Sequence, residues 1–434
     1  MLLIYSDKIS PRLQYISQFI IGEQLGISYQ LTDDKSELNR HEGAILQYAQ
    51  EKTSIDQKKY FFIKANGLLT ESGIQPVDID ILQKGKQLFL FPQENTDFPL
   101  DIFSAGFYLI SRYEEYLPHD LDLYGRFSHT ASVAFQHGFL NRPLLNEWIV
   151  QLGECLKSFF PSISQNRVRF SFEPTYDIDI AYAYTGKSFI RNLGGFIKNP
   201  DMERWQVLAG KRKDPFDAYE SMDRWHHEYS LQPVYFFLVA GKRGKYDKNI
   251  DPQHPMLHSL IKAVSNKYKI GLHPSWNSNF KDELLEAEKN TLEQISGSEI
   301  TLSRQHYIRF NLPDTFRKLA AAGIKEEYSM GYGSINGFRA STGSSFLWYD
   351  LEKEQTTDLR IFPFCFMEAN SYYEQQQSTE MTLEEMEYYL MICRSYHCPM
   401  RTIFHNQFLG SDKSFKGWKE IYVSFLQRAS LQTL

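Results

Sequence analysis

The chain is poor in cysteine, and its cysteines follow no metal-binding or disulfide pattern. Four are present among 434 residues, and no two of them form a CxxC pair. They are Cys155, Cys365, Cys393 and Cys398. Isolated cysteines of this kind are typical of reduced thiols that pack as small apolar side chains, so the pattern argues against an oxidising compartment.

An export signal and a long apolar run are also missing. The first residues reach Asp7 and Lys8 after a short apolar stretch, whereas a secretory signal needs a basic start and roughly 7 to 15 apolar residues. The longest apolar runs, such as 233–240, are far shorter than the ~20 residues that span a bilayer. We therefore expect a cytoplasmic protein without a membrane span, in which these runs are buried strands.

Positive charge is scarce as well. The 47 Lys and Arg residues are outnumbered by 53 Asp and Glu residues, which gives a net charge of -6. Proteins that follow a phosphate backbone carry a basic patch or a run of Lys and Arg, and no such run is present. The composition thus argues against a nucleic-acid partner and favours a neutral or modestly charged ligand.

Apolar residues are abundant enough to form more than one hydrophobic core. The chain is 42% apolar and 15% aromatic, and its length exceeds what one core usually spans. A stretch rich in Pro, Ser, Asn and Gln at 161–166 has loop character, and we place the domain boundary there. The prediction is an α/β accessory domain over 1–162 and a second domain over 163–434. An apolar strand at 2–5 and a helix that begins at Ser10-Pro11 open the first domain.

The segment 98–116 predicts a largely buried helix, because its apolar residues recur every three or four positions. Its end, Arg112-Tyr-Glu-Glu115, is polar. Arg and Glu at this spacing form ion pairs along a helix, so we interpret this end as an element of a domain interface rather than as a ligand site.

Beyond residue 163, apolar strands alternate with helical segments. The expected strands are 167–172, 234–239, 270–272, 301–303, 327–328, 337–339, 359–364 and 402–404. The expected helices are 216–228, 255–266, 281–295, 313–322 and 382–395. This alternation is typical of parallel βα units. With seven or eight strands over this length, we predict an irregular (β/α)7-8 barrel preceded by the smaller α/β domain.

Polar residues that follow the expected strands are the candidate site residues, because reacting groups in such folds lie where strands end. They are Asp177, Asp179, His273, His306, Arg339, Glu368 and His405. In Asp177-Ile-Asp179 the two carboxylates lie on the same side of an extended chain. This spacing suits one metal-ligating carboxylate beside one that acts as a base.

Several motifs together carry a resemblance to a known family. They are Thr175-Tyr-Asp-Ile-Asp179, Gly271-Leu-His-Pro-Ser275, Ser303-Arg-Gln-His-Tyr307, the stretch from Tyr328 to Ala340, and Phe404-His-Asn406. The first resembles the opening motif of the polysaccharide deacetylases of carbohydrate esterase family 4, which have the NodB-homology fold. In this order, over residues 167–410, the motifs resemble an uncharacterised bacterial branch that has an extra N-terminal domain and occurs in surface-polysaccharide gene neighbourhoods.

The resemblance implies a role for each candidate residue. Asp177 would be the general base, Asp179 and His273 ligands of a divalent metal ion such as zinc, and Arg339 the arginine that orients the base. His405 would be the general acid, with Glu368 tuning it. The implied substrate is an N-acetylated carbohydrate, and the missing export signal favours a lipid-linked or nucleotide-activated precursor.

The sequence departs from the family at one ligand position. The usual second motif has two histidines four residues apart, and the residue four after His273 is Asn277. An amide oxygen binds zinc more weakly than imidazole does. Either Asn277 completes the site at reduced affinity, or another group replaces it; His306, at the end of the next expected strand, is our candidate.

Three alternatives stay open. A catalytically silent descendant that binds carbohydrate or scaffolds polysaccharide assembly would explain Asn277. A glycoside hydrolase that uses Asp177 or Asp179 with Glu368 would need carboxyl groups ~5 to 9.5 Å apart across an open cleft. Arg339, finally, could form a buried ion pair instead of orienting the base.

Overall fold

The computed structural model describes residues 1–55, 58–198 and 200–430, and the strands of these ranges form three sheets. The N-terminal sheet is parallel throughout, in the order β2-β1-β3-β4. Its strands are β1 (Leu2–Ser6), β2 (Tyr29–Thr32), β3 (Ala44–Ala49) and β4 (Phe61–Lys64). The expected helix begins at Pro11, and the Ser10 hydroxyl caps it by accepting a hydrogen bond from the Leu13 amide.

A short antiparallel hairpin and several helices complete the N-terminal region. The hairpin consists of β5 (Ile81–Lys84) and β6 (Gln87–Leu90). The helices are α1 (Pro11–Ser17), η1 (Gln18–Gln24), α2 (Lys35–Arg40), α3 (Ile102–Ile110), η2 (Tyr113–Tyr116), η3 (His129–Ala131), α4 (Val133–Gln136) and α5 (Leu144–Phe159). Every residue of α3 is buried, as the apolar periodicity of 98–116 predicts.

The second large sheet has the order β12-β13-β11-β10-β9-β8-β7-β15-β14. All of its ladders are parallel except the β12–β13 pair. Its strands are β7 (Phe172–Ile178), β8 (Val234–Phe237), β9 (Lys269–Leu272), β10 (Leu302–Ser303), β11 (Glu326–Glu327), β12 (Phe346–Asp350), β13 (Gln355–Ile361), β14 (Phe366–Met367) and β15 (Met400–His405). Within the described ranges the ladder runs from β12 to β14 without closing into a ring, so the predicted barrel is an open parallel sheet in its hydrogen bonding.

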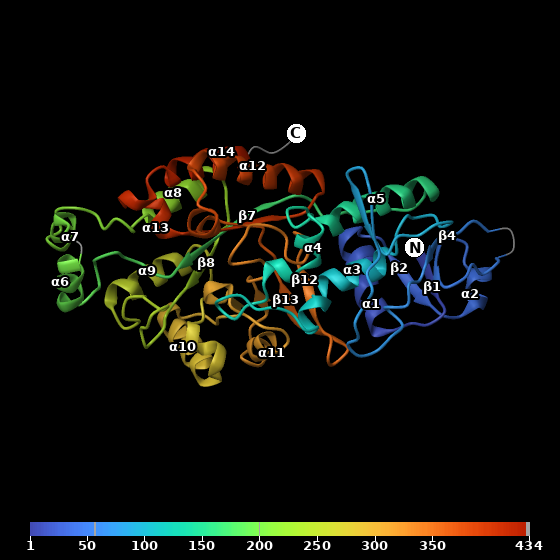
Figure 1. Cartoon of the computed structure of the whole chain (residues 1–434), viewed down its shortest axis with the longest axis horizontal. Helices are drawn as coiled ribbons and strands as arrows, with labels where there is room; N and C mark the ends of the chain where they lie inside the picture. The colour runs from blue at the N-terminus through green and yellow to red at the C-terminus, as the bar shows by residue number, and fades with distance from the viewer. Residues whose placement is uncertain (56–57, 199, 431–434) are drawn as a thin grey trace.

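Helices connect these strands and cover the sheet (Figure 1). They are α6 (Phe189–Lys198), α7 (Met202–Leu208), α8 (Tyr219–Glu228), α9 (Pro255–Ser265), η4 (Trp276–Phe280), α10 (Asp282–Ser296), η5 (His306–Ile308), α11 (Asp314–Ala321), η6 (Asn370–Glu374), α12 (Thr379–Ser395), α13 (Asn406–Leu409), η7 (Lys413–Phe415) and α14 (Trp418–Ser430). None of the helices in the described ranges combines the length and apolar character needed to cross a membrane.

Two local predictions differ from the structure. The strand expected at 167–172 begins at Phe172 and continues to Ile178, so that Asp177 lies inside β7. It extends this far because Thr175 to Asp177 pair with both β8 and β15, and Ile178 pairs with β8. The segment 337–339 is irregular rather than a strand, and β12 forms the antiparallel edge of the sheet instead.

The N-terminal region packs directly against the β12 edge of the large sheet. The ring of Phe107 in α3 lies 5.1 Å from that of Tyr349 in β12, and Phe19 lies 6.3 Å from Phe346. One cluster of buried apolar side chains extends through both regions. The two sheets therefore share a continuous core, and the boundary at 162/163 stays a prediction.

Candidate active site

The carboxyl ends of neighbouring strands bring the candidate residues to one edge of the large sheet. Asp179 follows β7, His273 follows β9, and Arg304 and His306 follow β10. β15 ends on His405. Because β10, β9, β8, β7 and β15 are consecutive in the sheet, the loops that follow them meet at the same edge.

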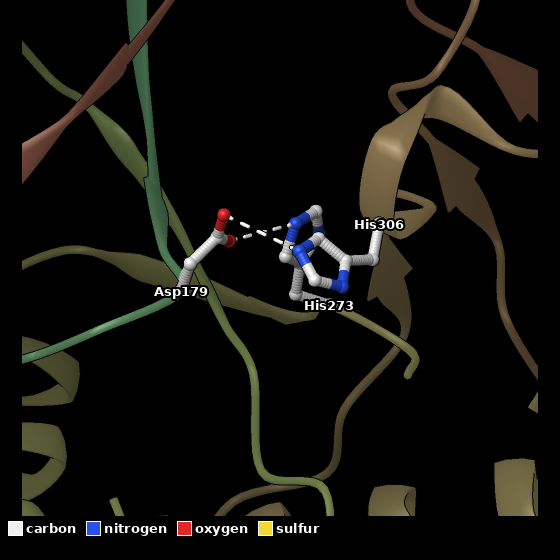
Figure 2. Close-up of side chains that lie close together, drawn as sticks. All are labelled: Asp179, His273 and His306. Carbon is white, nitrogen blue, oxygen red and sulfur yellow. Dashed lines mark ion pairs between the residues drawn. The ribbon is translucent and has the colours of Figure 1, made fainter. Parts of the chain in front are cut away.

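Three of these side chains point toward one another (Figure 2). His273 Nε2 lies 3.1 Å from Asp179 Oδ1, and His306 Nε2 lies 3.3 Å from Asp179 Oδ2. One potential ligand atom from each residue lies within 4.8 Å of the other two. Asp179 Oδ1 is buried and has no hydrogen-bond partner. A buried carboxylate oxygen facing two imidazole nitrogens is a donor set that suits a divalent metal ion.

The far side of each imidazole is held by a second group. His273 Nδ1 lies 2.6 Å from the backbone oxygen of Arg304, and His306 Nδ1 lies 3.0 Å from Asp247 Oδ1. Contacts of this kind fix the ring orientation and leave Nε2 as the atom for a metal, as in most protein-bound histidines at metal sites.

The charges of this cluster support one another. Burial alone would raise the pKa of Asp179, but His306, His405 and His273 outweigh it and lower that pKa well below its ordinary value. Burial lowers the pKa of His306, yet the carboxylates of Asp179 and Asp247 outweigh burial and raise the pKa to about 9. Without a metal ion, His306 is therefore protonated at neutral pH.

Asp177 lies beside the cluster and is held by a buried arginine. Arg304 Nη1 donates to Asp177 Oδ1 at 2.7 Å, and Arg304 Nε donates to the backbone oxygen of Tyr328 at 3.0 Å. The other carboxylate oxygen, Oδ2, lies 3.8 Å from His273 Nε2. Asp177 thus keeps one oxygen on the arginine and directs the other toward the potential metal ligands.

His405 and Glu368 form a hydrogen-bonded pair beside the cluster. Glu368 Oε1 accepts hydrogen bonds from the His405 backbone amide and lies 2.6 Å from His405 Nδ1. His405 Nε2 faces Asp179 Oδ2 at 3.5 Å. Burial lowers the pKa of His405, but Glu368 and then Asp179 outweigh it and raise the pKa to about 10. Glu368 thus favours the protonated form of the His405 imidazole.

A cavity of about 470 Å³ opens over these groups. Asp177, Asp179, His273, His306 and His405 all line it. The N-terminal region adds two lining side chains, and loops of the large sheet add several more. The added residues are Tyr124, Arg126, Tyr246, Lys248, Tyr307 and Tyr373. The cavity is therefore large enough and polar enough for a sugar unit.

Arg339 is not the partner of Asp177. Its guanidinium forms two hydrogen bonds to Glu115, with Nε to Oε1 at 2.8 Å and Nη2 to Oε2 at 2.6 Å. It also lies 4.1 Å from the ring of Phe310. The buried ion pair that sequence reasoning kept as an alternative is what the structure contains, because the N-terminal region supplies a carboxylate on this side. Arg304 holds Asp177 instead.

Asn277 lies outside the ligand cluster. It is an exposed residue of the short helix η4, whereas His273 is buried. The chain forms the helix η4 shortly after His273. This turn carries residue 277, four positions after His273, away from the cavity. The third residue that could hold a metal ion with Asp179 and His273 is His306, which corrects the expectation for Asn277.

Sequence reasoning missed two residues of this site. Arg304 follows β10 directly, so the strand-end rule that selects His306 could have selected it as well. Asp247 lies in the loop after β8, and its contacts with His306 and the Trp276 amide come from tertiary packing. Its only sequence signal is that it is the single acidic residue of 241–248, a segment that also contains four Lys and Arg residues.

Known proteins resemble this chain in parts. Residues 2–161 match the model of a family of unknown function, DUF7033. No curated protein matches the chain. A protein from Mycobacterium smegmatis assigned as a polysaccharide deacetylase has a TM-score of 0.41 and 11% identity, over 61% of this chain and 85% of its own.

Two further solved structures are similar over the same share of the chain. The polysaccharide deacetylase of Bacillus cereus has a TM-score of 0.30 and 9% identity, over 60% of this chain and 88% of its own. A family 4 carbohydrate esterase from Streptomyces lividans, solved with acetate, has a TM-score of 0.30 and 9% identity, over 60% of this chain and 90% of its own. At these scores the backbones correspond only in part.

Proposed function

We propose that the chain is a metal-dependent carbohydrate deacetylase, which hydrolyses the amide of an N-acetylated sugar in surface-polysaccharide metabolism. One observation carries the proposal: potential ligand atoms of Asp179, His273 and His306 lie within 4.8 Å of one another, beside Asp177 and at the wall of one cavity. The motifs of the sequence that resemble the family 4 deacetylases supply these same residues.

Asp179, His273 and His306 would hold the metal ion. Two imidazole nitrogens and a carboxylate oxygen suit zinc, the ion we propose, and also suit cobalt and nickel. A bound divalent ion supplies a Lewis acid that polarises the amide carbonyl of the substrate. Asp247 and the Arg304 backbone oxygen keep the two rings turned toward Asp179.

Asp177 is the general base of the proposed reaction. It takes a proton from the water that attacks the amide carbon, while Arg304 holds the carboxylate in place through Oδ1. His405 is the general acid, because Glu368 and Asp179 hold its imidazole in the protonated form. Its proton goes to the nitrogen of the departing amine, and the products are acetate and a free amino sugar.

The substrate we propose is a lipid-linked or nucleotide-activated carbohydrate in the cytoplasm. Tyrosines at the cavity wall offer apolar faces and hydroxyls, which suit the C–H and O–H surfaces of a sugar. Three of the four cysteines are buried and all four are free thiols, in agreement with a reducing compartment.

The contacts of the site weaken both alternative functions. Glu368 is fully buried behind His405 and bonded to it, so it is badly placed as the second carboxylate of a glycoside hydrolase. The catalytically silent alternative rests on Asn277, and His306 fills the position that Asn277 leaves.

The proposal is tested by acetate release together with metal content. Purified protein loaded with zinc, cobalt or nickel is assayed on a panel of acetylated sugars and sugar nucleotides, alongside the variants Asp177→Asn and Asn277→Ala. We expect Asp177→Asn to keep its metal and to lose about 10²- to 10⁴-fold in turnover. Asn277→Ala, a control at an exposed position in η4, should keep both.

Two results would contradict the proposed function. Acetate release that is unchanged in Asp177→Asn would remove Asp177 from the reaction. Release of reducing ends from an acetyl-free glycan, lost in the same variant, would favour a glycoside hydrolase.

A further inference from the structure

Helices α6 and α7 form a projection at the end of the molecule that is farthest from the N-terminal sheet (Figure 1). They lie between β7 and α8 in the chain. Within the projection, Phe196 of α6 packs edge-on against Trp205 of α7, with ring centroids 5.7 Å apart. Asn192 is buried on the same side of α6 and bonds to the backbone of Tyr184. This side of α6 is therefore its inner face.

The opposite face of α6 is apolar and open to solvent. Ile190, Leu193 and Ile197 lie three and four positions apart, and they are 81%, 40% and 73% exposed. Met202, at the start of α7, is 64% exposed. Large apolar side chains that stand together at this spacing form a continuous stripe along one helix, and an exposed stripe of this kind marks an interaction surface.

The chain around this stripe is basic. Residues 184–213 contain seven Lys and Arg against two Asp and Glu, and the loop 241–248 contains four against one, in a chain of net charge -6. Two of these cations are paired: Arg212 with Glu203 at 3.0 Å, and Lys213 with Asp217 and Glu220. Of the remaining acids, Asp201 caps α7 and Asp247 bonds to His306. Both segments therefore keep an excess of positive charge.

The two basic segments lie next to each other in space. A side chain added at Gly186 would meet Ile250 at 3.2 Å, which shows how closely the start of the projection approaches the chain after the 241–248 loop. Burial, and then the repulsion of Arg191 and Lys248, lowers the pKa of Lys187 to about 8. Arg243 acts in the same direction on Arg191. Asp214 raises the pKa of Lys187, but burial and the nearby cations outweigh it. Lys187, Arg191, Arg243 and Lys248 thus lie close enough to repel one another.

We propose that this surface, the α6 stripe with Met202 and the cations of the 241–248 loop, docks the protein on an anionic lipid bilayer. An amphipathic helix with aliphatic side chains on one face and Lys and Arg around it lies in the interface plane of a membrane. Each such cation gains further free energy from the negative surface potential of anionic lipids. Lys248 lines the active-site cavity, so docking would bring the mouth of that cavity close to the lipid surface.

A second copy of the chain is a poorer occupant of the same surface. Most homodimers are two-fold symmetric, so each residue of the contact meets a surface identical to its own. Such a contact would bring Arg191, Arg243 and their copies together, and like charges close to one another oppose association. A lipid surface of negative charge complements both the apolar stripe and the cations around it.

The test is sedimentation of the full chain with vesicles of phosphatidylcholine and with vesicles that also contain phosphatidylglycerol. We expect binding to the anionic vesicles that weakens as salt is added, and far less binding to pure phosphatidylcholine. The double variant Ile190→Ser/Ile197→Ser should weaken binding at least about tenfold. Lys242→Glu/Arg243→Glu, on a separate loop, should do the same through charge.

Matched controls are available on the other side of the molecule. Met381 and Met391 of α12 are also exposed, so Met381→Ser/Met391→Ser removes a similar apolar area and should leave vesicle binding unchanged. Lys325→Glu/Lys353→Glu is the control for charge: it reverses two exposed cations away from the proposed surface and should also leave vesicle binding unchanged.

The proposal is overturned by three results. One is failure to sediment with anionic vesicles. Another is binding that the α6 and loop variants leave intact. The third is a dimer in light scattering that Ile190→Ser/Ile197→Ser converts to a monomer, which would assign the surface to a second copy. Metal content plays no part in these measurements, so the outcome is independent of the proposed function.

Discussion

Two polar clusters of the molecule differ in how their charges are satisfied. In the first, Glu115 accepts hydrogen bonds from both Arg339 and Arg112. Arg112 also donates to Glu114 at 2.7 Å. In the second, Asp179 faces His273 and His306, and one of its oxygens is buried without a hydrogen bond.

The difference separates a structural cluster from a functional one. Two arginines and two glutamates cancel in charge, and aromatic rings such as Phe310 cover them, so nothing is left for a ligand. Burial raises the pKa of Glu115, but Arg339 and Arg112 outweigh it and lower the pKa to about 2. The Asp179 cluster keeps one unsatisfied carboxylate oxygen, Asp179 Oδ1, in a residue that lines a cavity, which is typical of a binding site.

The largest expected effect is on metal binding. Asp179→Ala removes the carboxylate that both imidazoles face, and we expect the protein to lose its divalent ion while the free energy of unfolding changes by about 1 kcal/mol. Elemental analysis and chemical denaturation measure the two quantities. A variant that keeps its metal would show that the ion lies elsewhere, and the comparison of the two clusters would fail.

The next variant changes the cluster of Glu115, Arg112 and Arg339, and its main effect is on stability. Glu115→Ala leaves Arg339 buried without its carboxylate and leaves Arg112 with Glu114 alone. We therefore expect the free energy of unfolding to fall by about 3–5 kcal/mol, with the metal still bound by the folded protein. As control, Lys267→Ala breaks an exposed pair with Asp223 and should cost about 0–1 kcal/mol. Equal losses in both variants would mean that the Glu115 cluster is an ordinary surface network.

A smaller effect on metal affinity is expected from Asp247, which contacts the proposed ligand His306. Asp247→Asn keeps a hydrogen-bond acceptor near His306 Nδ1 but removes the charge, and we expect affinity for cobalt to fall about 10- to 100-fold. Isothermal titration measures this directly. Asp223→Asn changes an exposed carboxylate that pairs with Lys267, and it should leave the affinity unchanged.

The smallest expected effect is a pH dependence of metal binding. The pKa of His306 is raised to about 9, so its imidazole is protonated at neutral pH and must lose this proton to bind a metal ion. Cobalt affinity should therefore rise about tenfold per pH unit up to pH ~9 and level off above it. In Asp247→Asn the pKa of His306 is lower, and the plateau should begin at a lower pH. An affinity that is flat between pH 7 and 9 would contradict this account of His306.

Much of the second region follows from local sequence. Most strand and helix positions from β8 to β15 agree with the alternating pattern, because most apolar runs are buried within one parallel strand; the segment 337–339 and the antiparallel strand β12 are the exceptions. The residues placed at strand ends, Asp179, His273, His306 and His405, meet at one edge because parallel strands share a direction. The Arg112 segment also follows the prediction, since Arg112 and Glu115 form the expected i,i+3 pair.

The remainder depends on contacts between distant segments. Arg339 pairs with Glu115, a residue 224 positions away, and no local pattern relates the two. The same holds for Arg304 and Asp177, which are 127 positions apart. Asn277 leaves the cavity because a short helix forms after His273, and the family motif predicts a different path there. Ion pairs between distant segments depend on the folded chain and cannot be predicted from either segment alone.

The most direct test of the central claim is the metal content of the purified protein after incubation with zinc, cobalt or nickel and removal of the excess. The account predicts about one ion per chain in the native protein and in Glu115→Gln, and none in Asp179→Ala or His306→Ala. A protein that binds no ion under any of these conditions, or that binds it equally in all four forms, would contradict the assignment of Asp179, His273 and His306 as a metal site.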